Sequence, residues 1–165
     1  MAPTSPTTSE FRLALGQFAT GVTVVTAARG PGQVHGMTAN SFTSVSLDPL
    51  LILICVSHVA QLLPLVQLQK RFGVNILKDH QRAISEYFAR TEESAETEKR
   101  LGIRYRWTQT GIPLLEDALA HLACKVVASH AAGDHTIFVA EAESVEVYDG
   151  EPLLYLRGNY REVAR

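Results

Sequence analysis

The sequence predicts a mainly β protein whose antiparallel strands form a closed or split barrel with a few peripheral helices. Many short apolar segments, β-branched in part and similar in spacing, are separated by turn residues, which is typical of such barrels. Strand-like and helix-like segments do not alternate, so a doubly wound parallel sheet is not expected. The chain has 165 residues, 46% of them hydrophobic, which is enough to bury one core.

The chain divides into a short lead-in, residues 1–9, and a single domain, residues 10–165. The lead-in is rich in Pro, Thr and Ser and is expected to be disordered. It has neither a basic start nor an apolar stretch, so a signal peptide is not expected. Ser9 is expected to cap a helix that carries Phe11, Leu15 and Phe18 on one face and ends at Gly21.

The remaining elements follow from apolar runs bounded by turn residues. Strands are predicted over residues 22–26, 34–39, 50–56, 72–77, 119–130, 136–148 and 153–156. Helices are predicted over residues 62–69 and from 80 to about 99. In the strand over 136–148 the apolar positions shift phase between Val139 and Ala142, which predicts a β-bulge.

Charge and cysteine content exclude several classes of protein. A net charge of −2 gives no electrostatic reason to expect binding to nucleic acid or to an anionic membrane. No apolar run approaches the roughly 20 residues that a membrane helix needs. Cys55 and Cys124 lie in apolar runs and are expected to be buried free thiols. Because no signal peptide is expected, the expected location is cytoplasmic.

Residues 36–46 are the first candidate for a site. This stretch holds five hydroxyl residues and one amide and is nearly free of charge. Such residues leave backbone N–H groups accessible and add donors of their own, which suits a phosphate group or the edge of a flavin ring. The alternative is an ordinary Thr-rich barrel strand without a ligand, and composition alone favours this alternative.

Other site classes find little support. Gly30, Gly32 and Gly36 do not form a dinucleotide fingerprint, because His35 occupies the third glycine position and a strand follows. No grouping of His and Cys has metal-site spacing, and no G-x-S-x-G motif is present. His135 follows Asp134 in a turn, where it is either a ligand or proton-transfer group or an ordinary surface histidine.

Four stretches resemble the NAD(P)H:flavin oxidoreductase family, the short-chain reductases that supply reduced flavin to two-component monooxygenases. They are Phe18–Thr26, Gly36–Pro49, Gly133–Ile137 and Pro152–Tyr155 with Arg157-Gly158. The weaker stretches Phe72–Leu77 and Gly111–Glu116 fall between them in the same order, so the resemblance covers nearly the whole chain after residue 10. It implies an FMN-binding split barrel, FMN or FAD as flavin, and a homodimer. NADH is favoured over NADPH because the sequence shows no obvious basic cluster for a 2′-phosphate.

The resemblance also implies which residues form the site. The flavin is expected to be lined by Thr38, Ala39, Asn40, Ser41, Ser44 and Val45. Ser57 is expected near the flavin phosphate, Asn75 beside the isoalloxazine ring or ribityl chain, and His135 close to the nicotinamide. Tyr160 and Arg161 are expected near the nicotinamide as well. Independently of the resemblance, the basic residues available to contact a 2′-phosphate are Arg157, Arg161 and Arg165.

One departure from the family leaves alternatives open. The turn Ser57–Gln61 is poorer in hydroxyl groups than the family's usual phosphate-binding turn, which implies looser flavin binding. That suits a reductase that releases reduced flavin to a partner monooxygenase. The alternatives are a flavoprotein that keeps its flavin and reduces another acceptor, and a flavin-binding protein without activity.

Overall fold

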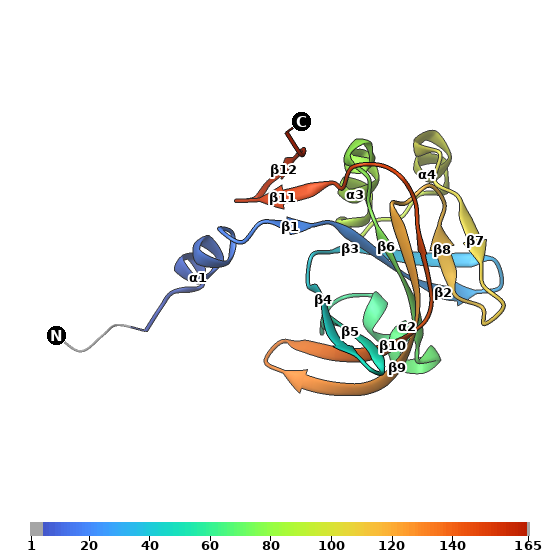
Figure 1. Ribbon diagram of the computed structural model, residues 1–165, viewed down its shortest axis with the longest axis horizontal. Helices are drawn as coiled ribbons and strands as arrows, with labels where there is room; N and C mark the ends of the chain where they lie inside the picture. Colours follow the sequence, from blue (N-terminus) through green and yellow to red (C-terminus); the bar gives the residue numbers. More distant parts are fainter. Residues whose placement is uncertain (1–4, 165) are drawn as a thin grey trace.

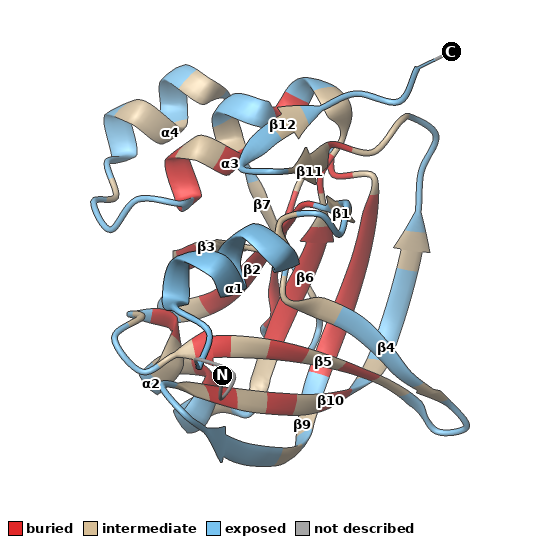
Figure 2. Cartoon of the chain, turned by 90° about the vertical axis from the view of Figure 1, so that its left-hand side faces the viewer, coloured by how far each residue is buried: buried red, intermediate tan, exposed pale blue. Residues whose placement is uncertain are grey.

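Seven antiparallel strands form the main sheet of the computed structural model, which describes residues 5–164. Their order is β3-β2-β6-β9-β10-β5-β4, and the sheet curls around a buried interior (Figures 1 and 2). The strands are β2 (Thr23–Gly30), β3 (Gln33–Ala39), β4 (Phe42–Leu47), β5 (Leu50–Ser57), β6 (Arg71–Ile76), β9 (Ala120–Ala132) and β10 (His135–Val147). The predicted mainly β, antiparallel barrel is confirmed.

Two hairpins build most of this sheet. Gly32 adopts a φ of +69° in the turn between β2 and β3, and Gly133 a φ of +61° in the turn between β9 and β10. Such angles are open to glycine at little steric cost. The pairing of β10 with β9 shifts between Val139 and Ala140, where Val127 of β9 is the extra residue, and again between Ala142 and Ser144, where Glu143 of β10 is the extra residue. The bulge of β10 therefore lies just beyond the predicted interval from Val139 to Ala142. These bulges let two 13-residue strands bend with the barrel.

Two small sheets complete the β structure. One consists of β1 (Thr20–Gly21), β11 (Leu154–Leu156) and β12 (Asn159–Arg161), in the order β1-β11-β12. The other pairs β7 (Tyr105–Trp107) with β8 (Pro113–Leu115). β7, β8 and β12 were not predicted from the sequence, because three residues are too few to show an alternating pattern. β4 in the main sheet was not predicted as a strand either.

The first helix, α1 (Thr8–Leu15), differs at both ends from its prediction. Thr7, rather than Ser9, is the cap: its hydroxyl oxygen accepts a hydrogen bond from the Glu10 backbone N–H, and the Glu10 carboxylate accepts one from the Thr7 N–H. The helix ends at Gly16, so Phe18 lies outside it. Thr8 and Ser9, assigned by sequence to the lead-in, are therefore helical, and residues 1–4 and Arg165 lie outside the described residues.

The long helix predicted from residue 80 to about 99 is interrupted. A 3₁₀ turn, η1 (Asp79–Gln81), leads into α3 (Arg82–Phe88), and α4 (Ala95–Leu101) starts after a separate cap. Ser94 is that cap, since its hydroxyl oxygen accepts from the Thr97 N–H. The helix α2 (Leu62–Gln69) has the predicted bounds.

Two clusters of buried side chains hold these elements together. The first fills the barrel, where Phe72, Phe138 and Ile54 are fully buried. The second lies between α3 and the strands above the barrel and includes Leu77 and Phe88. Both cysteines are free, Cys124 buried and Cys55 half-buried. Burial raises the pKa of the Cys124 thiol to about 12.

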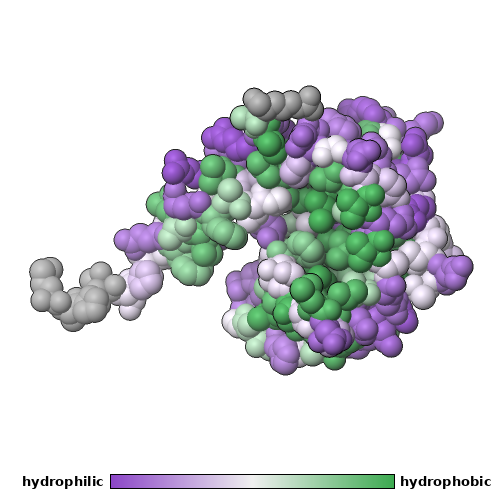
Figure 3. Space-filling model, in the orientation of Figure 1, coloured by the Kyte–Doolittle hydropathy of each residue, from purple (hydrophilic) through white to green (hydrophobic). Residues whose placement is uncertain are grey.

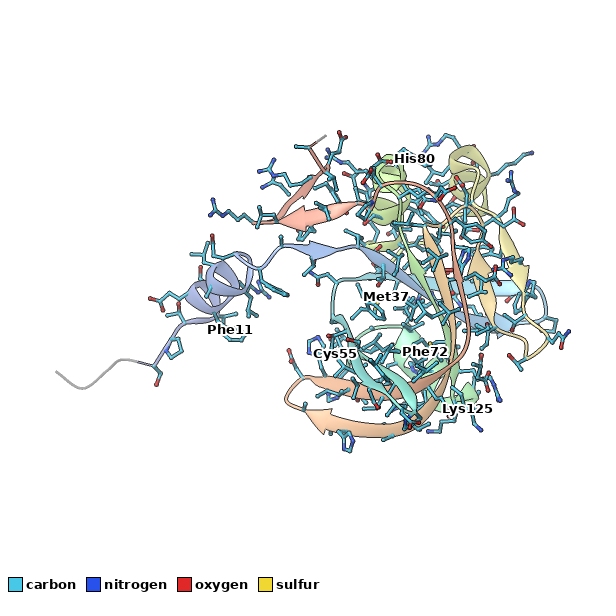
Figure 4. All side chains as sticks on the ribbon, in the orientation of Figure 1. Phe11, Met37, Cys55, Phe72, His80 and Lys125 are labelled. Carbon is cyan, nitrogen blue, oxygen red and sulfur yellow. The ribbon has the colours of Figure 1, made fainter. Side chains whose placement is uncertain are left out.

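Residues 8–18 form an arm that projects from the body of the molecule (Figure 1). No residue of α1 is buried, although Phe11, Leu13 and Leu15 are apolar, and each is more than half exposed. Figure 4 shows Phe11 on the arm and Phe72 inside the barrel. Among residues 5–164, no helix is long and apolar enough to span a membrane.

Candidate functional site

A pocket of about 200 Å³ opens where the end of β3 meets α3 and the β11–β12 hairpin. These three elements come from the first, middle and last parts of the chain, and together they supply apolar, hydroxyl and aromatic groups. The lining residues are Val22, Thr38, Ala39, Asn40, Ser85, Ala89, Tyr155 and Tyr160. We call this the site pocket.

A chain of hydrogen bonds fixes one wall of the site pocket. The Thr38 hydroxyl donates to the Ser85 backbone carbonyl at 2.7 Å, and the Ser85 hydroxyl lies 2.8 Å from the Tyr160 hydroxyl. Ser85 is fully buried, so this link is shielded from water. The Tyr160 ring also meets Tyr155 edge to face at 5.4 Å, and the Arg82 guanidinium lies 5.2 Å from its centre. The wall is therefore held on several sides.

Gly36 brings α3 against β3 and so makes this wall possible. A Cβ atom at Gly36 would lie 2.5 Å from ring carbons of Phe88, which is shorter than any tolerable contact. Because glycine has no Cβ, the Phe88 ring packs directly on the strand. That close approach places Ser85, one turn earlier on α3, within hydrogen-bonding distance of Thr38.

Asn40 and Ser41 connect β3 to β4. Asn40 lines the pocket, and within residues 5–164 its side-chain amide makes no hydrogen bond, so both its donor and its acceptor groups face solvent or a ligand. The Ser41 hydroxyl donates to the Cys55 carbonyl at 2.9 Å, which ties this crossing to β5. Ser44 and Val45 lie further along β4, outside the pocket lining. Val45 is the extra residue of a bulge opposite β5.

A second group of expected site residues lies at the other end of β5. Ser57 pairs with His135 across β5 and β10. The Asp134 carboxylate lies 2.7 Å from His135 Nδ1, and this hydrogen bond holds the pKa of Asp134 below its usual range. The His58 imidazole lies 3.2 Å from the Thr136 hydroxyl. These residues form one cluster, separate from the site pocket.

Two expected site residues lie elsewhere. Asn75 is fully buried: its amide donates to the Val24 carbonyl at 2.8 Å and its oxygen accepts from the Leu115 N–H at 2.8 Å. Its polar atoms are thus used within the core, and it does not line the pocket. Arg161 lines a neighbouring cavity of about 430 Å³ that shares Tyr160 with the site pocket.

Sequence reasoning missed half of the pocket lining. Val22, Ser85, Ala89 and Tyr155 come from elements on which no site was predicted. Tyr155 could have been identified from the sequence, because it lies in one of the stretches that carry the family resemblance. It pairs with Tyr160 across the hairpin. No sequence pattern marks Ser85 and Ala89 as site residues, because the predicted uninterrupted helix does not reveal how α3 packs on β3.

The chemistry of the pocket suits the edge of a flat, partly polar ring. Val22, Ala39 and the Tyr155 ring supply apolar contact, while Thr38, Asn40 and Tyr160 supply polar groups. Ligand pockets of this mixed kind orient a ring by a few placed hydrogen bonds. The fold defines a class, a small antiparallel split β-barrel, and the pocket at the end of β3 is its candidate site.

Comparisons with known proteins agree with this class. Residues 15–164 match the flavin reductase like domain. An NADH-dependent flavin reductase from a Rhodococcus species is 45% identical over 154 residues, which cover 92% of this chain and 84% of that protein. The reductase component of 4-hydroxyphenylacetate 3-monooxygenase from Thermus thermophilus is 39% identical over 155 residues, covering 93% of this chain and 95% of that protein.

Solved structures lead to the same family. The flavin reductase PheA2 superposes with a TM-score of 0.86 at 38% identity, covering 97% of this chain and all of that one. The Streptomyces globisporus NADH:FAD oxidoreductase SgcE6, in complex with NAD and FAD fragments, gives a TM-score of 0.85 at 35% identity, covering 94% of this chain and 92% of that one.

The chain belongs to the flavin reductase family. The predicted resemblance, the split-barrel fold and the enzyme class, an NAD(P)H:flavin oxidoreductase that uses flavin and NADH, are confirmed.

Proposed function

We propose that this protein transfers a hydride from NADH to FMN or FAD at the site pocket and releases the reduced flavin to a partner flavin-dependent monooxygenase. The observation that carries the proposal is the pocket itself, in which Thr38, Ala39 and Asn40 meet Ser85 and Tyr160. Relatives named as monooxygenase reductase components support the role of the partner.

The residues of the pocket position the flavin. When bound, the flavin supplies the electron-accepting ring for the hydride. Hydride transfer depends mainly on orientation, with the reacting atoms held about 3–3.5 Å apart. The hydrogen-bonded wall of Thr38, Ser85 and Tyr160 keeps one side of the pocket rigid, and the free amide of Asn40 donates to or accepts from the ring edge.

We assign His135 to the nicotinamide side. Its hydrogen bond to Asp134 fixes the orientation of the imidazole, which leaves Nε2 for a ligand. The role is positioning rather than acid catalysis, because hydride transfer itself needs no proton from this residue.

Weak retention of the flavin follows from the limited size of the site. At about 200 Å³, the pocket is below the range of roughly 300–1,000 Å³ that encloses a typical ligand. In the turn after β5, the His58 N–H already donates to the Asp134 carbonyl, and the Ser57 hydroxyl accepts from the Val59 N–H. Fewer groups of this turn are left to hold a phosphate.

The arm provides the surface for a homodimer. Phe11, Leu13, Leu15 and Phe18 are each more than half exposed, and Figure 3 shows apolar surface on the arm and on the adjoining face of the body. An apolar helix with no buried residue is stabilised when it packs on another surface, and here we assign that surface to a second copy. The free thiols fit a reducing compartment, so we place the protein in the cytoplasm.

NADH oxidation by the purified protein, with and without added FMN or FAD, tests the proposal. A rate that rises with added flavin and saturates is the expected result. Absence of a rate with either flavin would overturn the proposal. Tightly bound yellow flavin without NADH oxidation would show a binding protein instead.

A His135→Ala variant tests the nicotinamide assignment. We expect the KM for NADH to rise about tenfold while kcat stays within about threefold, because binding is lost and chemistry is not. His130→Ala, on the same hairpin, is the matched control and is expected to leave both constants unchanged. A fall in kcat of several orders of magnitude at constant KM would assign His135 to the chemical step.

A further inference from the structure

The loop between α3 and α4, residues 89–94, forms part of the rim of the site pocket. Ala89 lines the pocket, and the next three residues, 90–92, are exposed to solvent. We call residues 89–94 the rim loop. Its position must be set by a few specific contacts, because exposed backbone without apolar packing is easily displaced.

A cluster of charged side chains outside the pocket supplies the main contact. Glu93 Oε2 lies 2.9 Å from a guanidinium nitrogen of Arg29, and Glu93 Oε1 contacts Nδ1 of His35. The side chains of His35 and Glu93 are 7% and 19% exposed. A carboxylate at this depth is costly unless it is paired, so the ion pair of Oε2 with Arg29 is the contact that chiefly determines where the loop lies.

The opposite side of the cluster is equally constrained. Arg29 is the extra residue of a bulge in β2, between Ala28 and Gly30, and a bulge re-aims its side chain. Its guanidinium also donates to the Gln61 side-chain oxygen at 3.0 Å. The Gln61 amide reaches the Thr91 carbonyl at 3.4 Å, which adds a second link to the rim loop.

These contacts join the rim loop to the strands that carry the site. His35 directly precedes Gly36, on which Phe88 packs, and lies three residues before Thr38. The loop is therefore held at β3, at the same edge of the sheet where the pocket is built. The C-terminal end of the loop is held by a separate hydrogen bond, which the Ser94 N–H donates to the Tyr87 hydroxyl at 2.8 Å.

We propose that Glu93 is a positioning residue for flavin binding, which acts by clamping the rim loop onto Arg29 and His35. The inference rests on the proposed function for its substrate, whereas the clamp itself is a property of the free protein. Without the carboxylate, the loop loses its ion pair to β2 and β3 and keeps the 3.4 Å contact of Thr91 with Gln61 and the hydrogen bond at Ser94. Ala89, whose N–H donates to the Ser85 carbonyl at 3.0 Å, is then held at the pocket rim only from the α3 side.

The test compares Glu93→Ala with Glu92→Ala, a neighbouring exposed glutamate that contacts neither Arg29 nor His35. Amide hydrogen exchange of residues 89–94 is measured in the free protein, and the Kd for FMN is measured by quenching of flavin fluorescence. We expect Glu93→Ala to speed exchange in the loop and to weaken FMN binding about tenfold, since small misplacements of binding groups have large effects. Glu92→Ala is expected to change neither.

Two further measurements separate positioning from general damage. Glu93→Asp keeps the charge and is expected to restore part of the FMN affinity, and kcat at saturating flavin is expected to stay within about twofold in all variants. If Glu93→Ala does not fold, Arg29→Gln tests the same clamp from a side chain that is 40% exposed.

Unchanged exchange and unchanged FMN affinity in Glu93→Ala would overturn the inference. A wild-type protein that binds no flavin would instead overturn the proposed function, and the exchange measurement would still decide whether the clamp exists.

Discussion

The barrel interior and the arm use the same kinds of apolar residue in opposite ways. Phe72 and Phe138 are fully buried between strands, whereas Phe11 and Phe18 on the arm are 58% and 78% exposed. Apolar composition therefore does not reveal whether a residue stabilises its own domain. What matters is the surface that the side chain packs against. Inside the barrel this surface belongs to the same chain, and on the arm we assign it to a second copy. Substitutions in the two regions are expected to differ accordingly.

The largest effect is expected inside the barrel. Phe72→Ala removes a fully buried ring and leaves a cavity, which typically lowers the free energy of unfolding by about 3–5 kcal/mol. Urea denaturation followed by circular dichroism measures this loss. A loss below about 1 kcal/mol would mean that the barrel does not depend on this packing.

Asn75→Ala tests whether a buried polar group stabilises the core or serves the site. The change leaves the Leu115 N–H and the Val24 carbonyl without their partner, at a cost of about 2–3 kcal/mol. The FMN affinity of the folded variant is expected to be unchanged. Lost affinity at unchanged stability would return Asn75 to the flavin site.

His121 makes stability depend on pH in the core region. Burial, followed by the nearby Arg106, lowers its pKa from the ordinary value of 6.5, while its Nε2–H donates to the Leu115 carbonyl at 2.5 Å. Below about pH 6.5 the unfolded chain binds a proton that the folded chain resists, so acid destabilises the fold.

Urea titrations between pH 7.5 and about pH 5 measure this dependence, at most about 1.4 kcal/mol per pH unit for one group. His121→Asn is expected to flatten the curve. His35, whose pKa is also lowered chiefly by burial, accounts for part of what remains. An unchanged slope in His121→Asn would show that other groups set the acid sensitivity.

The smallest effect on folding is expected on the arm. Leu13→Ser alters a side chain that is 66% exposed, so the stability of the isolated subunit is expected to change by less than about 0.5 kcal/mol. Sedimentation velocity is expected to show a shift from dimer to monomer. A monomeric wild type would show that the arm serves another surface.

Prediction from sequence succeeded where elements are long and failed where they are short or depend on distant partners. The strand pairs around the two hairpins and α2 followed from apolar patterns, and the bulge predicted in β10 lies slightly later, at Glu143. The three-residue strands β7, β8 and β12 carry no periodic signal. The break between α3 and α4 was hidden because the residues between them are compatible with a helix.

The site was predictable only on the side that β3 builds. Thr38, Ala39 and Asn40 are neighbours in sequence, so a single motif identified them, and Tyr160 followed from the family resemblance. Ser85 reaches Thr38 across 47 residues, through a helix whose packing depends on Gly36. Asn75 matched the motif, but its polar groups are used by Leu115 and Val24, which no local pattern indicates.

The two bulges of the β9–β10 hairpin have a consequence for how the length of this chain can vary. Val127 on β9 and Glu143 on β10 are the extra residues that keep the buried faces in phase on both sides of each bend. A single-residue deletion elsewhere in these strands turns the following side chains to the opposite face. Related chains are therefore expected to gain and lose residues at the Gly133 tip and to conserve their spacing along the strands.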